Sequence, residues 1–192
     1  MIACLGNPGE EYSFTRHNVG FLIADAFALS LQKEEALASK KLFESDRLAW
    51  VCHSKFRGKP MLIVKPATYM NLSGKAVQYW MTSEKIQPEN LLVIADDIAL
   101  PFGTLRMKKK GSDGGHNGLN DIAATLNSTE YPRLRFGVGN DFAKGQQSDY
   151  VLGRWTSEQE KMLPERIDAA VEMIRSFVTS GIDRTMSAFN NK

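Results

Sequence analysis

The amino-acid sequence predicts an α/β fold, in which a single domain holds a mixed, mostly parallel twisted β-sheet sandwiched by helices. Short apolar runs typical of strands alternate along the chain with segments whose apolar residues recur at helical spacing. A length of 192 residues, 43% of them hydrophobic and 24% charged, suits one domain with a sizeable core. No internal repeat or interdomain linker divides the sequence, so we assign residues 1–192 to one domain.

The first part of the chain is expected to open on a strand and continue into a helix. The apolar segment 1–5 is followed by 6–9, where two glycines and a proline force a sharp turn. Apolar residues at helical spacing predict a helix over 19–31, with Asn18 as its N-cap. We expect residues 33–45 to hold the end of this helix and a surface loop.

A β-hairpin, a helix and a buried strand are predicted next. The runs 48–53 and 60–64 are joined by a link too short for a crossover helix, which predicts an antiparallel pair. Ser73 is in position to cap a helix that runs to about residue 85. The uninterrupted apolar run 91–95 is typical of a strand covered on both faces.

The remaining elements continue this alternation. They are a strand over 104–109, a helix over 117–126, a strand over 134–138 and a polar loop, expected to be mobile, over 139–148. The segment 157–160 (S-E-Q-E) fits a capping box for a long helix, in which Pro164 should introduce a kink or delay the start. Gly181 is expected to end that helix before a short terminal one.

The composition is that of a cytoplasmic protein without a membrane span. No apolar run approaches the roughly 20 residues that a membrane helix needs. The N-terminal residues lack the basic segment and apolar stretch of a secretory signal. Cys4 and Cys52 both lie in apolar, strand-like surroundings, so we expect buried free thiols in a reducing compartment.

A basic run stands out against the small net charge of +2. Arg106 and 108–110 place four cations in five residues, and Arg133, Arg135 and Lys144 follow. Such a stripe is compatible with docking one phosphate backbone. Lysines also protect exposed edge strands from aggregation, and for this run the two interpretations are equally favoured.

Polar side chains are predicted to gather where strands end and helices begin. Asn7 ends the first strand, Asp96 ends a buried strand, and His17 directly precedes a helix. Ligands in open α/β sheets bind at this edge. A carboxylate that accepts a hydrogen bond from one imidazole nitrogen leaves the other nitrogen able to take a proton from water. Seen alone, Asp96 is equally consistent with a helix or turn cap, and the neighbouring Asp97 should point the opposite way.

Three asparagines could complete such a site. Asn7, Asn71 and Asn117 each follow or open a turn, where asparagine commonly satisfies its own backbone. If they converge, their amides could donate to a carbonyl oxygen or an oxyanion. His116, beside two glycines, either caps its helix or takes part in the chemistry.

Other chemistries fit the sequence less well. No G-x-S-x-G motif exposes a nucleophilic serine. The histidines share no i, i+4 spacing and neither cysteine has a ligand pattern beside it, so we expect no metal site. The segment 111–115 is glycine-rich but lacks the lysine of a phosphate-binding loop, although its N–H groups could contact an RNA phosphate.

Five motifs, in one order along the chain, resemble bacterial peptidyl-tRNA hydrolases. They are G-N-P-G-x-x-Y-x-x-T-R-H-N at 6–18, Y-M-N-L-S-G-K at 69–75, D-D followed by L-P-F-G within 96–103, G-G-H-N-G-L at 114–119 and R-L-R-F-G-V-G at 133–139. The resemblance implies hydrolysis of the ester between a peptide and the 3′ ribose of tRNA, which recycles the tRNA. This reaction is expected to need no metal or organic cofactor, because an activated ester requires only a base and oxyanion donors. His17 would be the general base for a water molecule, with Asp96 orienting it.

The resemblance also implies the roles of further residues. Asn7, Asn71 and Asn117 would hold the substrate and the water, and Asn7 is linked to selecting a blocked amino group. The implied partner is peptidyl-tRNA, bound by a monomer through the acceptor stem, the 3′ CCA end and the peptide. The candidate contacts are Tyr12, Tyr69, Asn71, His116, Asn117, Lys108, Lys110 and Arg135. The two tyrosines could stack on a base or the peptide, or simply pack at the rim.

Two rival interpretations remain. Chloroplast splicing factors are similar to this family in fold and bind RNA through a partner without acting as hydrolases, but the presence of His17 and Asp96 disfavours a pure binding module. A small-molecule esterase would leave the lysine run without a role. The sequence departs from the family pattern at Asp113, close to where RNA should approach, and at Ala99, where an acidic residue is common.

Overall fold

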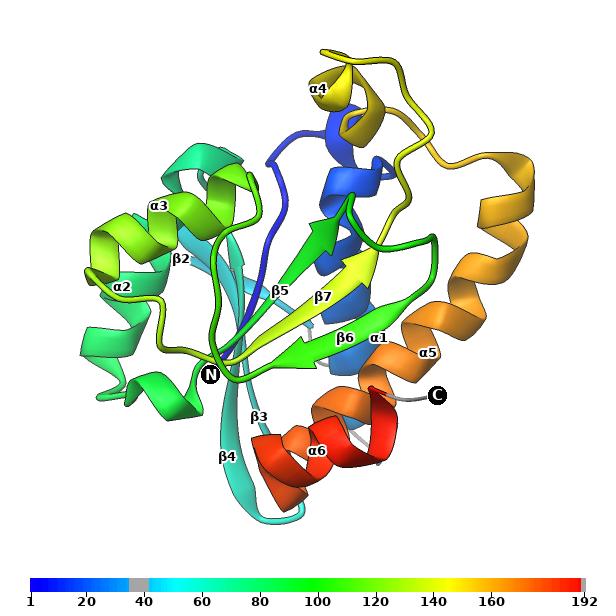
Figure 1. Ribbon diagram of the computed structural model, residues 1–192. Helices are drawn as coiled ribbons and strands as arrows, with labels where there is room; N and C mark the ends of the chain where they lie inside the picture. Colours follow the sequence, from blue (N-terminus) through cyan, green and yellow to red (C-terminus); the bar gives the residue numbers. More distant parts are fainter. Residues whose placement is uncertain (35–41, 191–192) are drawn as a thin grey trace.

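The computed structural model describes residues 1–34 and 42–190, which are organised around a seven-stranded β-sheet (Figure 1). The strands are β1 (Ile2–Cys4), β2 (Glu44–Asp46), β3 (Ala49–Phe56), β4 (Lys59–Pro66), β5 (Leu92–Asp97), β6 (Leu105–Lys108) and β7 (Arg133–Gly137). They lie in the order β2-β3-β4-β1-β5-β7-β6. Strands β4, β1, β5 and β7 are parallel, whereas β2, β3 and β6 each run antiparallel to a neighbour. The predicted mixed sheet with a parallel centre is confirmed.

Helices cover both faces of this sheet, as predicted (Figure 1). One face carries α1 (Val19–Glu34), α5 (Ser157–Ser180) and α6 (Ile182–Phe189), and the other carries α2 (Ser73–Ser83) and α3 (Asn117–Leu126). The short α4 (Gln147–Val151) follows β7 at the edge where the parallel strands end. No helix among the described residues is long and apolar enough to cross a membrane.

The central strand β5 shows why the sheet is buried on both faces. All of its residues are buried, and their side chains alternate between the two faces. Leu92 and Ile94 pack into the cluster formed with α1 and α5, whereas Val93 and Ala95 pack with α2 and α3. Full burial of each such aliphatic side chain contributes about 1.5–3 kcal/mol, which explains the uninterrupted apolar run.

The two cysteines differ in environment. Cys4 on β1 is fully buried, as predicted, and this burial raises the pKa of its thiol. Cys52 on β3 is only half-buried, so the prediction of two buried cysteines was wrong for the second.

Strand β2 was missed in the sequence and lies at one edge of the sheet. We expected residues 33–45 to hold a helix end and a loop; α1 does end at Glu34, but 35–41 lie outside the described residues. Residues 44–46 instead pair antiparallel with 49–51 of β3. All three β2 residues are polar and exposed, so the strand is defined by its backbone pairing and no alternating apolar pattern in the sequence predicts it.

Three predicted helix starts were wrong in detail. The Asn18 side chain binds the backbone of Asn7 instead of capping α1. Leu72, not Ser73, occupies the N-cap position of α2. The capping box of α5 lies one residue earlier than expected, between Thr156 and Gln159, and Pro164 lies inside the helix without delaying its start.

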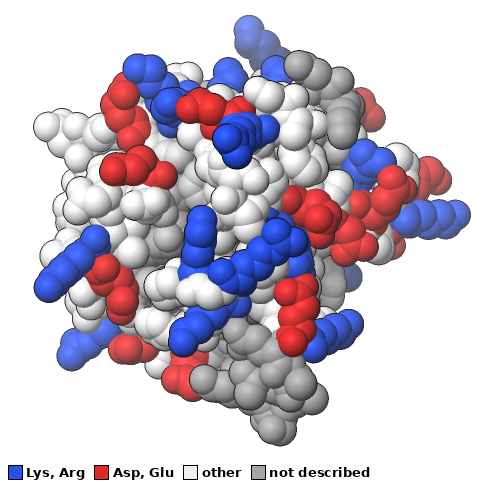
Figure 2. Space-filling view, turned by 90° about the horizontal axis from the view of Figure 1, so that it is seen from below, with Lys and Arg blue, Asp and Glu red and all other residues white. Residues whose placement is uncertain are grey.

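The basic run lies on edge strand β6 and directly after it, at the end farther from the edge where the parallel strands end. Leu105 is in register with Phe136 near the end of β7, whereas Lys108 is in register with Arg133 at its beginning. The Nζ atoms of Lys109 and Lys110 are 3.2 and 2.9 Å from carboxylates of Asp183 and Glu130. In Figure 2, which views the molecule from below, lysine and arginine side chains lie close to carboxylates.

Candidate active site

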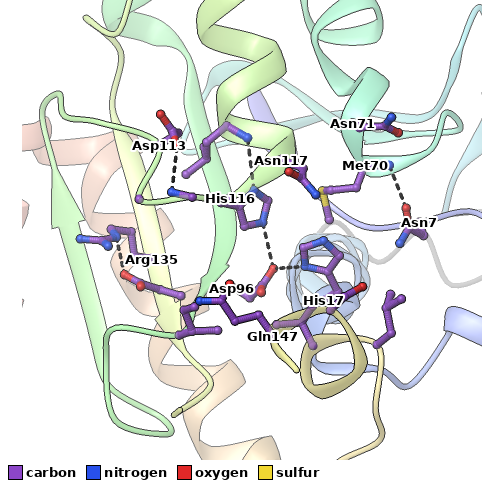
Figure 3. Close-up of a pocket in the computed structure, with 18 of the residues that line it drawn as sticks. Asn7, His17, Met70, Asn71, Asp96, Asp113, His116, Asn117, Arg135 and Gln147 are labelled. Atoms are coloured by element: carbon purple, nitrogen blue, oxygen red, sulfur yellow. Dashed lines mark hydrogen bonds and ion pairs between the residues drawn. The ribbon is translucent and has the colours of Figure 1, made fainter. Parts of the chain in front are cut away.

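A pocket of about 570 Å³ opens at the edge of the sheet where the parallel strands end (Figure 3). The predicted site residues that line it are Asn7, His17, Tyr69, Asn71, Asp96, His116, Asn117 and Arg135. They come from the segments that follow β1 and β4, from the end of β5, from β7 and from the start of α3. This convergence follows from the parallel sheet, because the carboxyl ends of its strands meet at one edge.

His17 and Asp96 form a buried pair at the floor of the pocket. Nδ1 of His17 lies 2.8 Å from Oδ1 of Asp96, and the two residues are 8% and 4% exposed. Burial alone would raise the pKa of Asp96, but His17 and His116 outweigh it and hold this pKa well below its ordinary range. Because the ionised carboxylate only accepts hydrogen bonds, Nδ1 of His17 carries a proton and Nε2 is left as a base.

His116 both caps a helix and contacts the carboxylate, whereas the sequence had presented these roles as alternatives. Its Nδ1 accepts hydrogen bonds from the backbone N–H groups of Gly118 and Leu119, at 3.1 and 3.2 Å. An accepting nitrogen carries no proton, so the proton of the neutral ring is on Nε2. Nε2 donates to Oδ1 of Asp96 at 3.0 Å, the same atom that His17 contacts.

Asn7 is held in place by three hydrogen bonds. Its backbone N–H donates to Oδ1 of Asn18 and its carbonyl accepts from Nδ2 of Asn18, at 2.8 and 2.9 Å. Its side-chain Oδ1 accepts from the backbone N–H of Met70 at 2.8 Å. The amide Nδ2 of Asn7 is therefore the donor left for a ligand in the pocket. Asn18, 1% exposed, is a supporting residue that sequence reasoning had assigned to a helix cap.

The other two asparagines lie closer to solvent. Asn71 belongs to the short 3₁₀ helix Met70–Leu72, and Asn117 is the first residue of α3. Both are exposed and both line the pocket, on the side of Asn7 in Figure 3. Tyr69 is 57% exposed at the pocket lining, which leaves its ring face open to a ligand.

Arg135 and Asp97 form a charged wall of the pocket. Nε of Arg135 is ion-paired with Oδ2 of Asp97, and Oδ1 of Asp97 accepts from the backbone N–H of Ala99 at 2.8 Å. Asp97 was expected to point the opposite way from Asp96; it has partners other than those of Asp96, but both residues line the same pocket. Figure 3 shows Arg135 on the opposite side of the pocket from Asn7.

Three predicted contacts are not brought into the pocket. Tyr12, at the end of the 3₁₀ helix Glu10–Tyr12, is half-buried and does not line it. Lys108 and Lys110 lie beyond it, at the far end of β6. Their involvement with a ligand stays a prediction, and it would require a ligand that extends well outside the pocket.

The pocket also contains residues that sequence reasoning missed. The loop expected over 139–148 ends in the first residues of α4, which runs over Gln147–Val151. The pocket is lined by Gln147, Ser148 and Val151 of α4 and by Leu152 directly after it. A five-residue helix is too short to produce a periodic pattern, so no sequence signal identifies it.

Asp113 also lines the pocket, and it occupies a backbone donor of the glycine-rich loop. Its Oδ1 accepts from the N–H of Gly115 at 2.8 Å, and Gly114 and Gly115 have φ values of +63° and +81°. Positive φ angles of this kind favour glycine, which has no Cβ. The N–H of Gly115 is thus already bonded within the loop, which removes one of the donors expected for an RNA phosphate.

His17, Asp96 and His116 are also close enough to be considered as metal ligands, with their candidate atoms within 4.8 Å of one another. However, Nδ1 of His17 and Nε2 of His116 both point at one carboxylate oxygen as hydrogen-bond donors. A metal ion would have to displace both bonds. The geometry therefore favours a hydrogen-bonded base over a metal centre.

Comparisons with known proteins identify the family of the chain. The family model described as peptidyl-tRNA hydrolase matches residues 1–192. A peptidyl-tRNA hydrolase from Cytophaga hutchinsonii is 52% identical over 192 residues, which cover 100% of this chain and 98% of that protein. One from Phocaeicola vulgatus is 50% identical with the same coverage. The crystal structure of peptidyl-tRNA hydrolase from Acinetobacter baumannii has a TM-score of 0.88 at 31% identity and covers 98% of this chain and 93% of its own. The chain therefore belongs to the peptidyl-tRNA hydrolase family.

Proposed function

We propose that this protein hydrolyses the ester bond that links a peptide, or an N-blocked amino acid, to tRNA, and so returns the tRNA to translation. The observation that carries the proposal is the buried His17–Asp96 pair, with Nδ1 and Oδ1 2.8 Å apart at the floor of a pocket. Carboxylic ester hydrolysis needs a base for water and donors for the oxyanion, and the pocket has candidates for both.

His17 acts as the general base in this proposal. Its Nε2 takes a proton from a water molecule as the water oxygen attacks the ester carbonyl. Asp96 stabilises the imidazolium that forms, because its carboxylate is ionised and fixed on Nδ1. The proton then passes from Nε2 to the departing 3′ oxygen of the ribose, and the products are the peptide acid and tRNA with a free hydroxyl group.

Three amides hold the substrate and the attacking water. The free Nδ2 donor of Asn7 suits a peptide carbonyl, because its Oδ1 is already bonded to Met70. Asn117 lies at the N-terminus of α3, where the partial positive charge of the helix favours a developing oxyanion. Asn71, at the open side of the pocket, positions the substrate beside His17.

The tRNA lies along the outer part of the site. The exposed ring of Tyr69 stacks on an unpaired base of the 3′ CCA end, and Arg135 meets a phosphate of the acceptor end. Tyr12 offers a further aromatic face at the rim, and Lys108 and Lys110 contact more distant phosphates. A monomer working in the cytoplasm without a metal or organic cofactor belongs to the same proposal.

A non-catalytic RNA-binding role, as in the chloroplast splicing factors, is the second candidate. It predicts tRNA binding without turnover. The arrangement of His17 on an ionised carboxylate speaks against it, since a binding module has no use for a buried base with its Nε2 open to the pocket.

The test is the release of free tRNA from N-acetyl-aminoacyl-tRNA by the wild-type protein. Unblocked aminoacyl-tRNA and a simple alkyl ester of the same N-acetyl amino acid serve as comparisons. We expect turnover of the blocked tRNA ester far above that of both. Binding without release would favour the splicing-factor interpretation, and equal turnover of the alkyl ester would favour a small-molecule esterase.

A further inference from the structure

Arg16, the residue before the proposed catalytic histidine, is a buried cation whose hydrogen-bond and ring partners are neutral. It is 6% exposed, and the described ion pairs do not include it. Its guanidinium carbon lies 4.3 Å from the centroid of the Tyr150 ring. Its terminal nitrogens donate to the carbonyl of Tyr150 at 3.2 Å and to Oε1 of Gln159 at 3.1 Å. Burying a charge without a counter-ion is costly, so stability alone does not account for an arginine here.

The element that Arg16 holds is α4, which forms one wall of the pocket. A five-residue helix is too short to be stable by itself and depends on tertiary contacts. Tyr150 supplies them on the side away from the pocket. Its hydroxyl donates to the carbonyl of Val138 at 2.7 Å, its ring lies 4.8 Å from that of Phe142, and its other neighbour is the Arg16 guanidinium.

Backbone contacts join the same two segments just beyond α4. The N–H of Arg16 donates to the carbonyl of Gly153 at 3.1 Å, and Thr15 forms an isolated β-bridge with Arg154. The third partner, Gln159, also accepts through Oε1 from the backbone N–H of Thr156, within the capping box of α5. Arg16 therefore ties together the turn that carries His17, the helix that forms the wall, and the start of α5.

We propose that Arg16 is a positioning residue that sets the distance between His17 and the α4 wall of the pocket. It does not line the pocket and does not touch the substrate. Its planar guanidinium group donates to a carbonyl and to a carboxamide at the same time as it stacks on an aromatic ring, and a lysine ammonium group cannot make all three contacts. The substrate that α4 contacts is thereby presented to Nε2 of His17. The inference rests on the proposed hydrolysis, but the placement of α4 can be measured without it.

Arg16→Met and Arg16→Lys test this role, with Arg184→Met, an exposed arginine on α6, as the matched charge control. Because the His17–Asp96 pair is left intact, we expect Arg16→Met to raise KM about tenfold and to change kcat by less than about twofold. Arg16→Lys keeps a cation over the Tyr150 ring, so its KM should lie between those of the wild type and Arg16→Met. Hydrogen exchange at the amides of 147–153 should become faster, with that of β5 unchanged.

The exchange measurement separates the inference from the proposed function, since it needs no substrate. Tyr150→Leu supplies a second route, because it removes the ring from under the guanidinium but keeps the accepting carbonyl. Its effects on KM and on exchange at 147–153 should be less than additive with those of Arg16→Met. Unchanged exchange in α4, exchange that rises equally in β5, or a KM equal to that of Arg184→Met would each overturn the role.

Discussion

His17 and His116 donate hydrogen bonds to the same atom, Oδ1 of Asp96, at 2.8 and 3.0 Å. The two rings are tilted by 47° with centroids 5.0 Å apart. His116 is fixed as a neutral tautomer because its other nitrogen accepts two N–H groups at the start of α3. The carboxylate beside the proposed base is thus itself held by the N-cap residue of the helix that begins with Asn117. One oxygen atom of Asp96 joins the proposed base to the start of the helix that carries a proposed oxyanion donor.

His116→Asn separates the two roles of this histidine. Asparagine is a good N-cap but is too short to reach Asp96, so the cap is kept and we expect the free energy of unfolding to fall by about 1.5–3 kcal/mol, the contribution of a hydrogen bond to a charged group. The rate should also fall, because Asp96 loses one of its two donors; a decrease in kcat of about tenfold is expected. Urea unfolding and steady-state kinetics measure the two effects. His116→Ala, which loses the cap as well, is the comparison, and a wild-type kcat in His116→Asn would remove the contact with Asp96 from the mechanism.

The pH dependence of stability reports on Asp96. The pKa of Asp96 in the folded protein lies below the ordinary value of 3.8. Well above pH 3.8 the carboxyl group is ionised in both the folded and the unfolded state, so its contribution to stability is complete. As the pH falls below about 4 the unfolded state binds more protons, and stability is lost progressively. We expect the wild type to lose more free energy of unfolding between pH 5 and pH 3 than Asp96→Asn does, as measured by urea titrations. Parallel curves for the two proteins would show that folding does not lower the pKa of this carboxyl group.

Asn18→Ala tests the support of Asn7. The substitution removes both hydrogen bonds that fix the backbone of Asn7 and leaves a buried N–H and carbonyl unsatisfied. We expect a loss of about 2 kcal/mol in the free energy of unfolding, together with a lower kcat/KM for N-acetyl-aminoacyl-tRNA. Asn18→Asp keeps the acceptor for the N–H of Asn7 but buries a negative charge against the carbonyl of Asn7, so it should be destabilised at least as much as Asn18→Ala. If Asn18→Ala is destabilised yet keeps full kcat/KM, the position of Asn7 does not matter for turnover.

Much of the fold follows from sequence periodicity, because strands such as β5 and helices such as α3 are encoded by apolar spacing within one short segment. The edge strands of the sheet and the helix caps do not follow from this periodicity. Strand β2 is polar and is defined only by its pairing with β3, and α4 is held by Arg16, 134 residues away along the chain. The carboxylate partners of Lys109 and Lys110 are likewise 74 and 20 residues distant. Such long-range pairs leave no local pattern.

The same distinction explains what the sequence could say about the site. Motif resemblance and strand ends together identified His17, Asp96 and the three asparagines as neighbours. The double role of His116 depends on the angle between two segments, and the clamp of Asn18 on Asn7 depends on how a turn folds back. Both are properties of packing and become visible only in three dimensions.

The contribution of the basic run can be measured through salt. Lys108 and Lys110 lie away from the pocket, so they should affect only substrates that extend beyond it. For full-length N-acetyl-aminoacyl-tRNA we expect Lys108→Ala to reduce the slope of log affinity against log salt by about one. N-acetyl-aminoacyl-adenosine, which lacks the rest of the tRNA, should be hydrolysed equally by both proteins. An unchanged slope would assign this lysine to protection of the sheet edge.

The most direct measurement compares the release of tRNA from N-acetyl-aminoacyl-tRNA by His17→Ala and by His53→Ala. His53 is an exposed histidine on β3 and does not line the pocket, so its replacement controls for the loss of an imidazole. The account predicts that His17→Ala binds the substrate but loses roughly 100- to 10,000-fold in kcat, whereas His53→Ala retains the wild-type rate. Equal rates for the two variants would contradict His17 as the base.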